Sequence, residues 1–375
     1  MIEFPSHWTN CQLGERIRFE YGKSPNEVRC SDGKYPVYGS SGKTALAINY
    51  TTESPAIIVG RKGTIDKPIF LQERCWAIDT TFFADKFPSD DPKYLFFLLD
   101  SINLRSLNES TGVPSLSRDA LHSIPVSLPP LPEQKKIAEI LSGIDEMINC
   151  KKRRIAKLSV FKSGLSIDLI YGKSVKKGVA SGSISDIAEI NPKTIVKLPS
   201  DSQISFIAMQ DTSETGEVNR TQVRSLNEVI IGYTRFRNND ILVAKITPCF
   251  ENGKGGFPEN LLNGVGFGST EFHVLRAIQN KAVSKFIHHI TKSERFRKAG
   301  EASMTGSAGQ KRIPADFIKH FSINIPSLSD QEEIACILTS IDMAIEKQAI
   351  EVNALANLKS SLAADLLSGR KRVSI

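Results

Sequence analysis

Apolar positions follow a 4-3 rhythm in two segments of the chain, which predicts two long amphipathic helices. The first series is Ile137, Leu141, Ile144, Ile148, Ile155, Leu158, Leu165 and Leu169. The second series is Ile334, Leu338, Ile341, Ile345, Val352, Leu355, Leu362 and Leu366. Polar residues interrupt both series at the same two steps, with Lys151 matching Gln348 and Lys162 matching Lys359. This shared pattern favours a coiled-coil seam through which the two helices pack together.

The ends of these helices carry recognisable signals. The first should begin at Pro132–Glu133, because proline suits the first helical position and acids suit the positive end of the helix dipole. The second should begin at Ser329, which can form a capping box with Glu332. Gly172 and Gly369 are typical of helix C-caps. Each helix would run roughly 35–40 residues, or about 50–60 Å.

The two helices belong to an internal repeat. Residues 128–148 and 325–345 are identical at ten of 21 positions, at a constant offset of 197 residues. Such a period is too long for a solenoid and indicates a duplicated domain, each copy being a variable segment followed by a near-constant helix. Antiparallel pairing of the helices would give a pseudo-two-fold molecule. The alternative is that each helix packs only on its own domain, although a globular domain seldom needs so long a helix.

The variable segments, about 1–127 and 176–324, predict two α+β domains of matching layout. Each starts with short apolar runs between turn residues, such as PAIIVGRKG and NNDILVAKITP. Each then continues through a helical stretch, a Gly/Ser/Thr loop and a short strand before the long helix. The expected division is a first domain, a first helix, a second domain and a second helix over residues 1–130, 131–172, 173–327 and 328–375.

Composition indicates an ordinary globular protein with a modest positive charge. Charged residues are 24%, hydrophobic residues 40%, and the formal net charge is +7. Basic residues cluster at 151–154, 173–177 and 370–372, as phosphate-binding patches or as solvated helix ends. The six cysteines form no CxxC pair, which fits reduced thiols in a cytoplasmic protein. No apolar stretch is long enough to suggest a membrane span.

No motif predicts catalysis. GSSGKT (39–44) resembles the end of a phosphate-binding loop, but Val37 stands where that motif needs glycine. The glycine-rich runs at 253–257 and 264–270 lack the strand–helix context of a dinucleotide site. Carboxylates and histidines are scattered, without the spacing of metal ligands. We therefore expect a non-catalytic chain without its own metal or cofactor.

Basic and polar residues gather in glycine-rich loops between the predicted strands of both segments. Such side chains bind phosphates or read base edges, although any one of them taken alone is more often simply solvated. The DNA-binding candidates are Ser40, Ser41, Arg61, Lys62, Thr64, Thr80, Thr81, Arg235, Arg237, Lys245, Thr247, Asn252, Lys254, Ser269 and Thr270. The candidates for the helix-pair interface are Ile137, Leu141, Ile144, Ile148, Ile155, Leu158, Ile334, Leu338, Ile341, Ile345, Val352 and Leu355.

The repeated phrase L-P-x-x-EQ-x-x-IA-x-x-L resembles the conserved-region signature of specificity subunits from bacterial type I restriction-modification systems. The resemblance extends over the chain, through HWTNCQLGERIRFEYGKSP (7–25), GVPSLSRDAL (112–121) and GSISDIAEINPK (182–193). The second copy of the phrase departs from the first, with Ser329, Asp330 and Cys336 in place of Pro132, Glu133 and Glu139. These changes are conservative for a capped helix.

The resemblance implies an α+β fold with two target-recognition domains joined by two long antiparallel coiled-coil helices. Each domain would read one half of a gapped double-stranded DNA site in the major groove, and the helix pair would set the gap. Two modification subunits, encoded elsewhere, would dock on this chain and methylate adenine with S-adenosylmethionine. Motor-nuclease subunits would complete the restriction enzyme.

Two other interpretations stay open at this point. One keeps the fold but places the chain in a fused nuclease–methyltransferase system of type IIB-like character. The other is a coiled-coil scaffold that does not read DNA.

Overall fold

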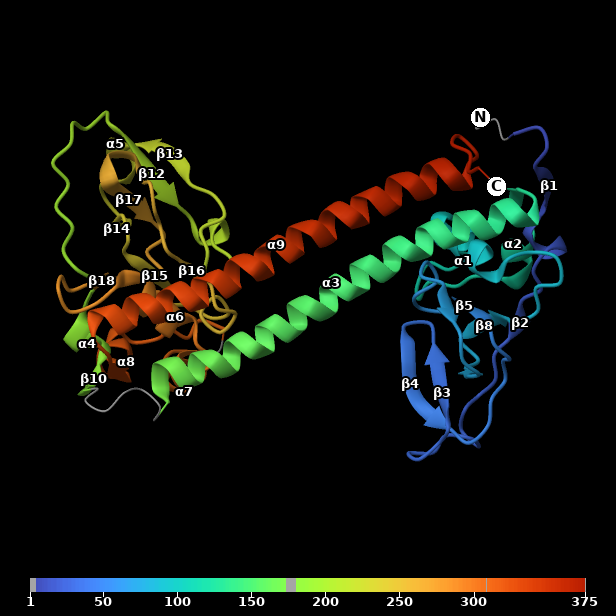
Figure 1. The fold of residues 1–375 in the computed structure, drawn as a ribbon, viewed down its shortest axis with the longest axis horizontal. Coiled ribbons are helices and arrows are strands. Elements are labelled where there is room, and N and C mark those ends of the chain that lie inside the picture. Colours follow the sequence, from blue (N-terminus) through green and yellow to red (C-terminus); the bar gives the residue numbers. More distant parts are fainter. Residues whose placement is uncertain (1–4, 173–179, 308, 375) are drawn as a thin grey trace. The chain divides into compact units, whose positions relative to one another are not determined.

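The computed structural model describes residues 5–172, 180–307 and 309–374, and the chain divides into two compact units (Figure 1). Unit 1 comprises Met1–Lys152 and Ile350–Ile375, and unit 2 comprises Arg153–Ala349. Each long helix therefore contributes one part to each unit. The basic cluster at 173–177 lies outside the described residues, and the predicted four-segment division stays a prediction.

Unit 1 contains three small sheets. An antiparallel pair joins β1 (Thr9–Gln12) to β9 (Pro125–Leu128). A four-stranded sheet has the order β2 (Glu20–Tyr21), β8 (Thr81–Ala84), β5 (Ala56–Gly60) and β6 (Ile69–Leu71). The third has the order β4 (Gly42–Ala47), β3 (Tyr35–Gly39) and β7 (Trp76–Ala77). Its helices are η1 (Leu13–Glu15), α1 (Pro92–Ser101), η2 (Leu104–Leu107) and α2 (Arg118–His122).

Unit 2 has the same plan. Its antiparallel pair is β10 (Ala180–Ser183) with β19 (Ser322–Ile325). Its two four-stranded sheets have the orders β11-β18-β15-β16 and β13-β12-β17-β14. These strands are β11 (Ala188–Ile190), β12 (Gln203–Ile207), β13 (Gln222–Ser225), β14 (Thr234–Arg237), β15 (Ile241–Ala244), β16 (Gly255–Gly256), β17 (Val265–Gly268) and β18 (Phe272–Ala277). The helices are α4 (Ile184–Ile187), η3 (Met209–Asp211), α5 (Leu226–Val229), η4 (Leu262–Gly264), α6 (Ser284–Lys292), α7 (Glu294–Ser303) and α8 (Ala315–His320).

The sheets of the two units correspond strand by strand. The order β2-β8-β5-β6 matches β11-β18-β15-β16, and β4-β3-β7 matches β13-β12-β17, with β14 as an addition in unit 2. β3 runs parallel to β7, as β12 does to β17. Every residue of β5 and of β15 is buried, as continuous apolar runs such as AIIV and ILVA predict for interior strands. The predicted duplication of an α+β domain is confirmed.

The long helices are α3 (Leu131–Tyr171) and α9 (Leu328–Leu367), and within each unit their segments run antiparallel (Figure 1). In unit 1, Lys359 of α9 pairs with Asp145 of α3 at 2.7 Å. In unit 2, Lys162 of α3 pairs with Asp342 of α9. The lysines that interrupt the apolar seam thus hold ion pairs across it. Among the described residues, no helix is long and apolar enough to cross a membrane.

All the predicted interface residues lose solvent contact, although to different degrees. Six are buried, namely Ile137, Leu141, Ile144, Ile148, Ile334 and Leu338. The other six are half-buried, namely Ile155, Leu158, Ile341, Ile345, Val352 and Leu355. Each long helix enters a domain core at both of its ends. Ile137 of α3 shares an apolar cluster with Leu366 of α9, and Ile334 of α9 shares another with Ile170 of α3.

The second long helix begins earlier than the sequence suggested. Its cap is Ser327, whose hydroxyl accepts the Asp330 N–H at 3.2 Å and donates to the Asp330 carboxylate at 2.6 Å. The capping box expected between Ser329 and Glu332 is therefore wrong. The sequence offers two overlapping Ser-x-x-acid pairs, and the structure uses the one that directly follows Pro326, which no pattern in the sequence distinguishes.

A buried glutamine fastens each long helix to its domain. Gln134 Nε2 donates to Pro129 O at 3.0 Å, and its Oε1 accepts the Asp91 N–H at 2.9 Å, where α1 begins. Gln331 repeats both bonds, to Pro326 O at 3.0 Å and from the Val283 N–H at 2.9 Å, where α6 begins. This explains why the glutamine of the EQ/DQ motif occurs in both copies of the repeat.

Candidate nucleic-acid interface

Three loops meet at one edge of unit 1. The Arg61 N–H, after β5, donates to Thr80 O at 2.9 Å, and Arg61 O accepts the Leu116 N–H at 2.9 Å. Gly63 N donates to Pro114 O at 2.9 Å. We call residues 61–64, 78–80 and 109–118 the unit-1 loop edge. Backbone hydrogen bonds fix this edge, so that its side chains project from a rigid frame.

The same three loops meet in unit 2 through equivalent bonds. The Lys245 N–H donates to Glu271 O at 2.7 Å, and Lys245 O accepts the Ile313 N–H at 2.9 Å. Thr247 N donates to Lys311 O at 3.0 Å. We call residues 245–248, 269–271 and 303–313, apart from position 308, the unit-2 loop edge. Lys245 therefore occupies the place that Arg61 has in unit 1.

The hairpin turn between β3 and β4 reaches the unit-1 loop edge. A Cβ on Gly60 would lie 2.0 Å from Thr64 O and 3.0 Å from Ser40 Cβ, so only glycine fits there. Gly63 has a φ of 84° and would place a Cβ 3.3 Å from Ser40 Oγ. The GSSGKT segment is thus a tight hairpin turn beside the loop edge.

All the unit-1 candidates except Thr81 reach the surface. Lys62 and Ser41 are exposed, whereas Ser40, Arg61, Thr64 and Thr80 are half-buried at or beside the loop edge. Thr81 is different, because it is fully buried and its hydroxyl donates to Ile78 O at 2.6 Å. We therefore leave Thr81 out of the surface offered to a ligand. Its burial follows from its position at the start of the central strand β8.

The unit-2 candidates are more dispersed. Lys245, Thr247, Ser269 and Thr270 lie at the loop edge, and Arg235 joins Lys245 in lining a cavity of about 710 Å³. That cavity also has Lys193 and Tyr233 in its wall, two residues that loop composition alone did not select. Arg237 is exposed at the end of β14, Lys254 is half-buried before β16, and Asn252 donates to Glu214 at 3.2 Å. The structure does not place these last three in the cavity wall.

Two cations of the unit-2 loop edge, Lys245 and Arg312, already have partners. Lys245 Nζ donates to Thr270 O at 2.7 Å, and burial lowers the pKa of its ammonium group. Arg312 makes hydrogen bonds of 2.8 and 3.0 Å to the two oxygens of Glu271. The bonds from Arg312 hold the pKa of that carboxyl below its usual range. This edge therefore presents an ion pair to a ligand.

The unit-1 loop edge has a different character. The guanidinium carbons of Arg61 and Arg118 lie 5.3 and 5.0 Å from the ring centroid of Tyr21, which is 47% exposed. Tyr21 and Arg118 were not among the sequence candidates, because the search favoured glycine-rich loops. The signal that could have found them is their place in the segments 7–25 and 112–121, which carry the family resemblance.

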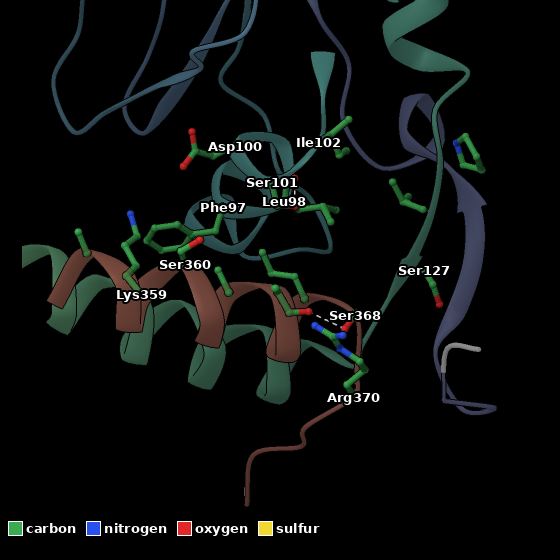
Figure 2. A pocket seen from close by; sticks show the side chains of 16 residues that line it. Phe97, Leu98, Asp100, Ser101, Ile102, Ser127, Lys359, Ser360, Ser368 and Arg370 are labelled. Atoms are coloured by element: carbon green, nitrogen blue, oxygen red, sulfur yellow. Dashed lines mark hydrogen bonds between the residues drawn. The ribbon is translucent and has the colours of Figure 1, made fainter. Parts of the chain in front are cut away.

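A separate groove of about 720 Å³ lies in unit 1 between α1, β9 and α9 (Figure 2). Phe97 and Lys359 lie side by side in its wall, with the ammonium 5.1 Å from the ring centroid. At the corresponding place in unit 2, residues of α7 such as Glu294 and Arg297 line a smaller space of about 430 Å³. Among the described residues, no group of three or more His, Cys, Asp or Glu side chains could hold a metal ion.

Comparison with known proteins agrees with a duplicated recognition module. Residues 5–160 and 176–353 each match the family model described as the type I restriction modification DNA specificity domain. The chain therefore belongs to this family, and its two matched regions are the two copies of the repeat.

Named relatives cover the chain to different extents. The specificity subunit of the type I restriction enzyme EcoAI from Escherichia coli is 42% identical over 42% of this chain, a match that spans 27% of that protein. The match to the EcoEI specificity subunit is 41% identical and spans 25% of that protein. The chain thus aligns with about a quarter of each of these two relatives. The MjaVIII specificity subunit of Methanocaldococcus jannaschii is 25% identical over 99% of this chain and 95% of its own length.

Solved structures share the fold. The S subunit of a type I restriction-modification system from M. genitalium aligns over 98% of this chain and 96% of its own, with a TM-score of 0.67 at 12% identity. A chain from a structure concerned with complex assembly and conformational transition of the type I system aligns with a TM-score of 0.54, over 97% of this chain and 98% of its own.

Proposed function

We propose that this chain is the sequence-specific DNA-binding specificity subunit of a type I restriction-modification enzyme, with each unit reading one half of a bipartite site. The observation that carries the proposal is the equivalence of Arg61 and Lys245. The same backbone bonds hold both residues, yet their neighbouring side chains differ. One scaffold that presents two different chemistries suits a site with two different halves.

The loop edges supply both kinds of contact that DNA recognition needs. Exposed cations such as Lys62 would neutralise phosphates, which makes affinity fall with salt concentration. Arginine and polar side chains would read base edges in the major groove, at about 1–3 kcal/mol of discrimination for each good bidentate contact. The frame of backbone bonds keeps these groups oriented before DNA binds.

The helix pair would join the two readers, set the length of the unread gap and dock two methyltransferase subunits. Catalysis would then belong to partners: adenine methylation with S-adenosylmethionine to the modification subunits, and cleavage to motor-nuclease subunits. We place this complex in the cytoplasm, where it meets chromosomal DNA. The relatives named above are all described as type I subunits, which favours this system over a fused nuclease–methyltransferase.

Methylome sequencing tests the proposal. A methylation-free host should gain a gapped, asymmetric adenine-methylation motif when it expresses this chain together with its methyltransferase subunit, and no motif when it expresses the methyltransferase alone. A continuous palindromic motif, or no motif with both proteins present, would refute the proposed function.

A further inference from the structure

Tyr21, Arg61 and Arg118 form a cluster of side chains on the surface of unit 1. Each is held by its own element. Tyr21 ends β2 and packs edge-on against Phe82 at a centroid distance of 5.1 Å. Arg61 is fixed by backbone bonds on both sides. Arg118 is the first residue of α2, which Ser117 caps by accepting the Ala120 N–H at 3.2 Å. The cluster is therefore set in place without a ligand.

The two guanidinium groups of this cluster have no carboxylate partner among the residues that the structure describes. The one side-chain hydrogen bond of Arg61 goes from Nη1 to Asp79 O at 3.2 Å. Arg118 Nε is buried and has no acceptor. Elsewhere in unit 1, an arginine beside a tyrosine is neutralised, since Arg74 lies 4.8 Å from the Tyr50 ring and pairs with Glu53 at 2.8 Å. The other N–H groups of these two half-buried guanidinium groups also lack an acceptor among the described residues, and they lie next to an exposed aromatic ring.

Donors of this kind suit either a phosphate group or the O6 and N7 acceptors of guanine. Comparison with unit 2 favours guanine. The counterparts of Arg61 and Arg118 there are Lys245, whose ammonium binds Thr270 O, and Ala315, the first residue of α8. Phosphate contacts carry no sequence information, whereas base contacts must differ between two half-sites of different sequence. The arginine pair is confined to unit 1, as a base-reading element would be.

We propose that Arg61 and Arg118, positioned by Tyr21, read guanine in the half-site that unit 1 binds. This inference rests on the proposed function and adds the base class and the residues that recognise it. Because lysine keeps the charge but lacks the planar fork of arginine, Arg118→Lys should retain overall binding and lose the preference for guanine. Tyr21→Phe should keep the preference, because the ring remains, and Tyr21→Ala should weaken it.

The test is methylome mapping, together with binding of duplex libraries by the chain in complex with its methyltransferase subunit. With Arg118→Lys or Arg61→Lys, guanine preference at one base pair of one half-site should fall about 10- to 100-fold. The other half-site should read as in the unmodified protein, which also shows that the variant folds. Arg74→Lys is the matched control and should leave the motif unchanged.

Two results would overturn the inference while the proposed function stands. One is an unaltered motif in Arg118→Lys, Arg61→Lys and Tyr21→Ala. The other is a uniform loss of affinity for all sequences with a shallower salt dependence, which marks phosphate contacts. If the unmodified chain yields no bipartite motif at all, the proposed function fails first, and this inference fails with it.

Discussion

Lys359 of α9 lies 2.7 Å from Asp145 of α3, and the residues 197 positions away in sequence form the same ion pair with the helices exchanged. Lys162 belongs to α3 and Asp342 to α9. Each helix therefore supplies one lysine and one aspartate to the seam. In unit 2, Lys292 also reaches Asp342, at 3.2 Å, and α6 joins the network there.

The Lys359–Asp145 ion pair should stabilise the folded chain. In a double-mutant cycle of Lys359→Ala and Asp145→Ala, we expect a coupling free energy of about 1 kcal/mol, because both side chains are half-buried. Denaturant unfolding measures it. The more exposed pair Lys136–Glu139 is the control and should give less than about 0.5 kcal/mol. Equal couplings for the two pairs would contradict the expected effect of burial.

The buried glutamines should be costly to remove. Gln331→Ala leaves the Val283 N–H and the Pro326 carbonyl without their partner, so the free energy of unfolding should fall by about 1–3 kcal/mol. Gln134→Ala should do the same in unit 1. Thermal and denaturant unfolding measure the change, with the exposed Gln279→Ala as the control. A loss no larger than that of the control would show that these bonds do not fasten the helix.

Acid should destabilise unit 2 through its buried histidines. Burial lowers the pKa of His273 to about 4 and that of His289 to about 3, from an ordinary value near 6.5. Both groups stay neutral in the folded chain but take up protons in the unfolded chain. The free energy of unfolding is therefore unaffected by these two groups above pH 6.5. It declines as pH falls toward 4, by up to about 1.4 kcal/mol per pH unit for each group.

Unfolding measured from pH 7 to pH 4.5 checks this expectation. His273→Asn and His289→Asn should make the free energy of unfolding less dependent on pH. They should also lower stability at pH 7, because they remove the bonds to Ile313 O and Thr339. His320→Asn, at an exposed position of α8, is the control. An unchanged slope in the double variant would assign acid sensitivity to other groups.

Shortening both long helices should shorten the DNA gap. Removing residues 150–156 and 348–354 takes one heptad from each helix and keeps the apolar seam in register. Seven residues span about 10 Å of helix, which corresponds to about three base pairs. Methylome sequencing reports the gap directly, and an unchanged gap would exclude the ruler role of the helix pair.

Loss of Lys245 should affect only one half-site. Lys245→Ala removes the ammonium that holds Thr270 O and leaves the backbone of the unit-2 loop edge in place. Reading of one half of the motif should weaken or relax, while the other half stays the same. The exposed Lys298→Ala in α7 is the control. An equal loss in both halves would show that Lys245 contributes only general affinity.

The parts of the structure that follow from the spacing of apolar residues and from the internal repeat could be predicted from the sequence. The heptad series located both long helices to within a few residues, and the repeat implied two units of one topology. The loop edges could not be derived, because Arg61, Thr80 and Leu116 meet only after distant strands have paired. Thr81 shows the same limit, since one position separates the half-buried Thr80 from a side chain enclosed in the sheet. Tyr21 and Arg118, which are 97 residues apart, come together for the same reason.

The way α9 completes unit 1 has a consequence for biosynthesis. Leu366 and Leu367 belong to the same apolar core as Phe19, Ile57 and Phe82, so this core needs both the first and the last parts of the chain. Unit 2 is continuous and can mature as soon as residue 349 leaves the ribosome. Unit 1 must wait, with part of its apolar surface uncovered, until Leu366 and Leu367 have also left the ribosome. A ribosome paused between the synthesis of residues 349 and 366 would therefore carry a complete second unit and an incomplete first one.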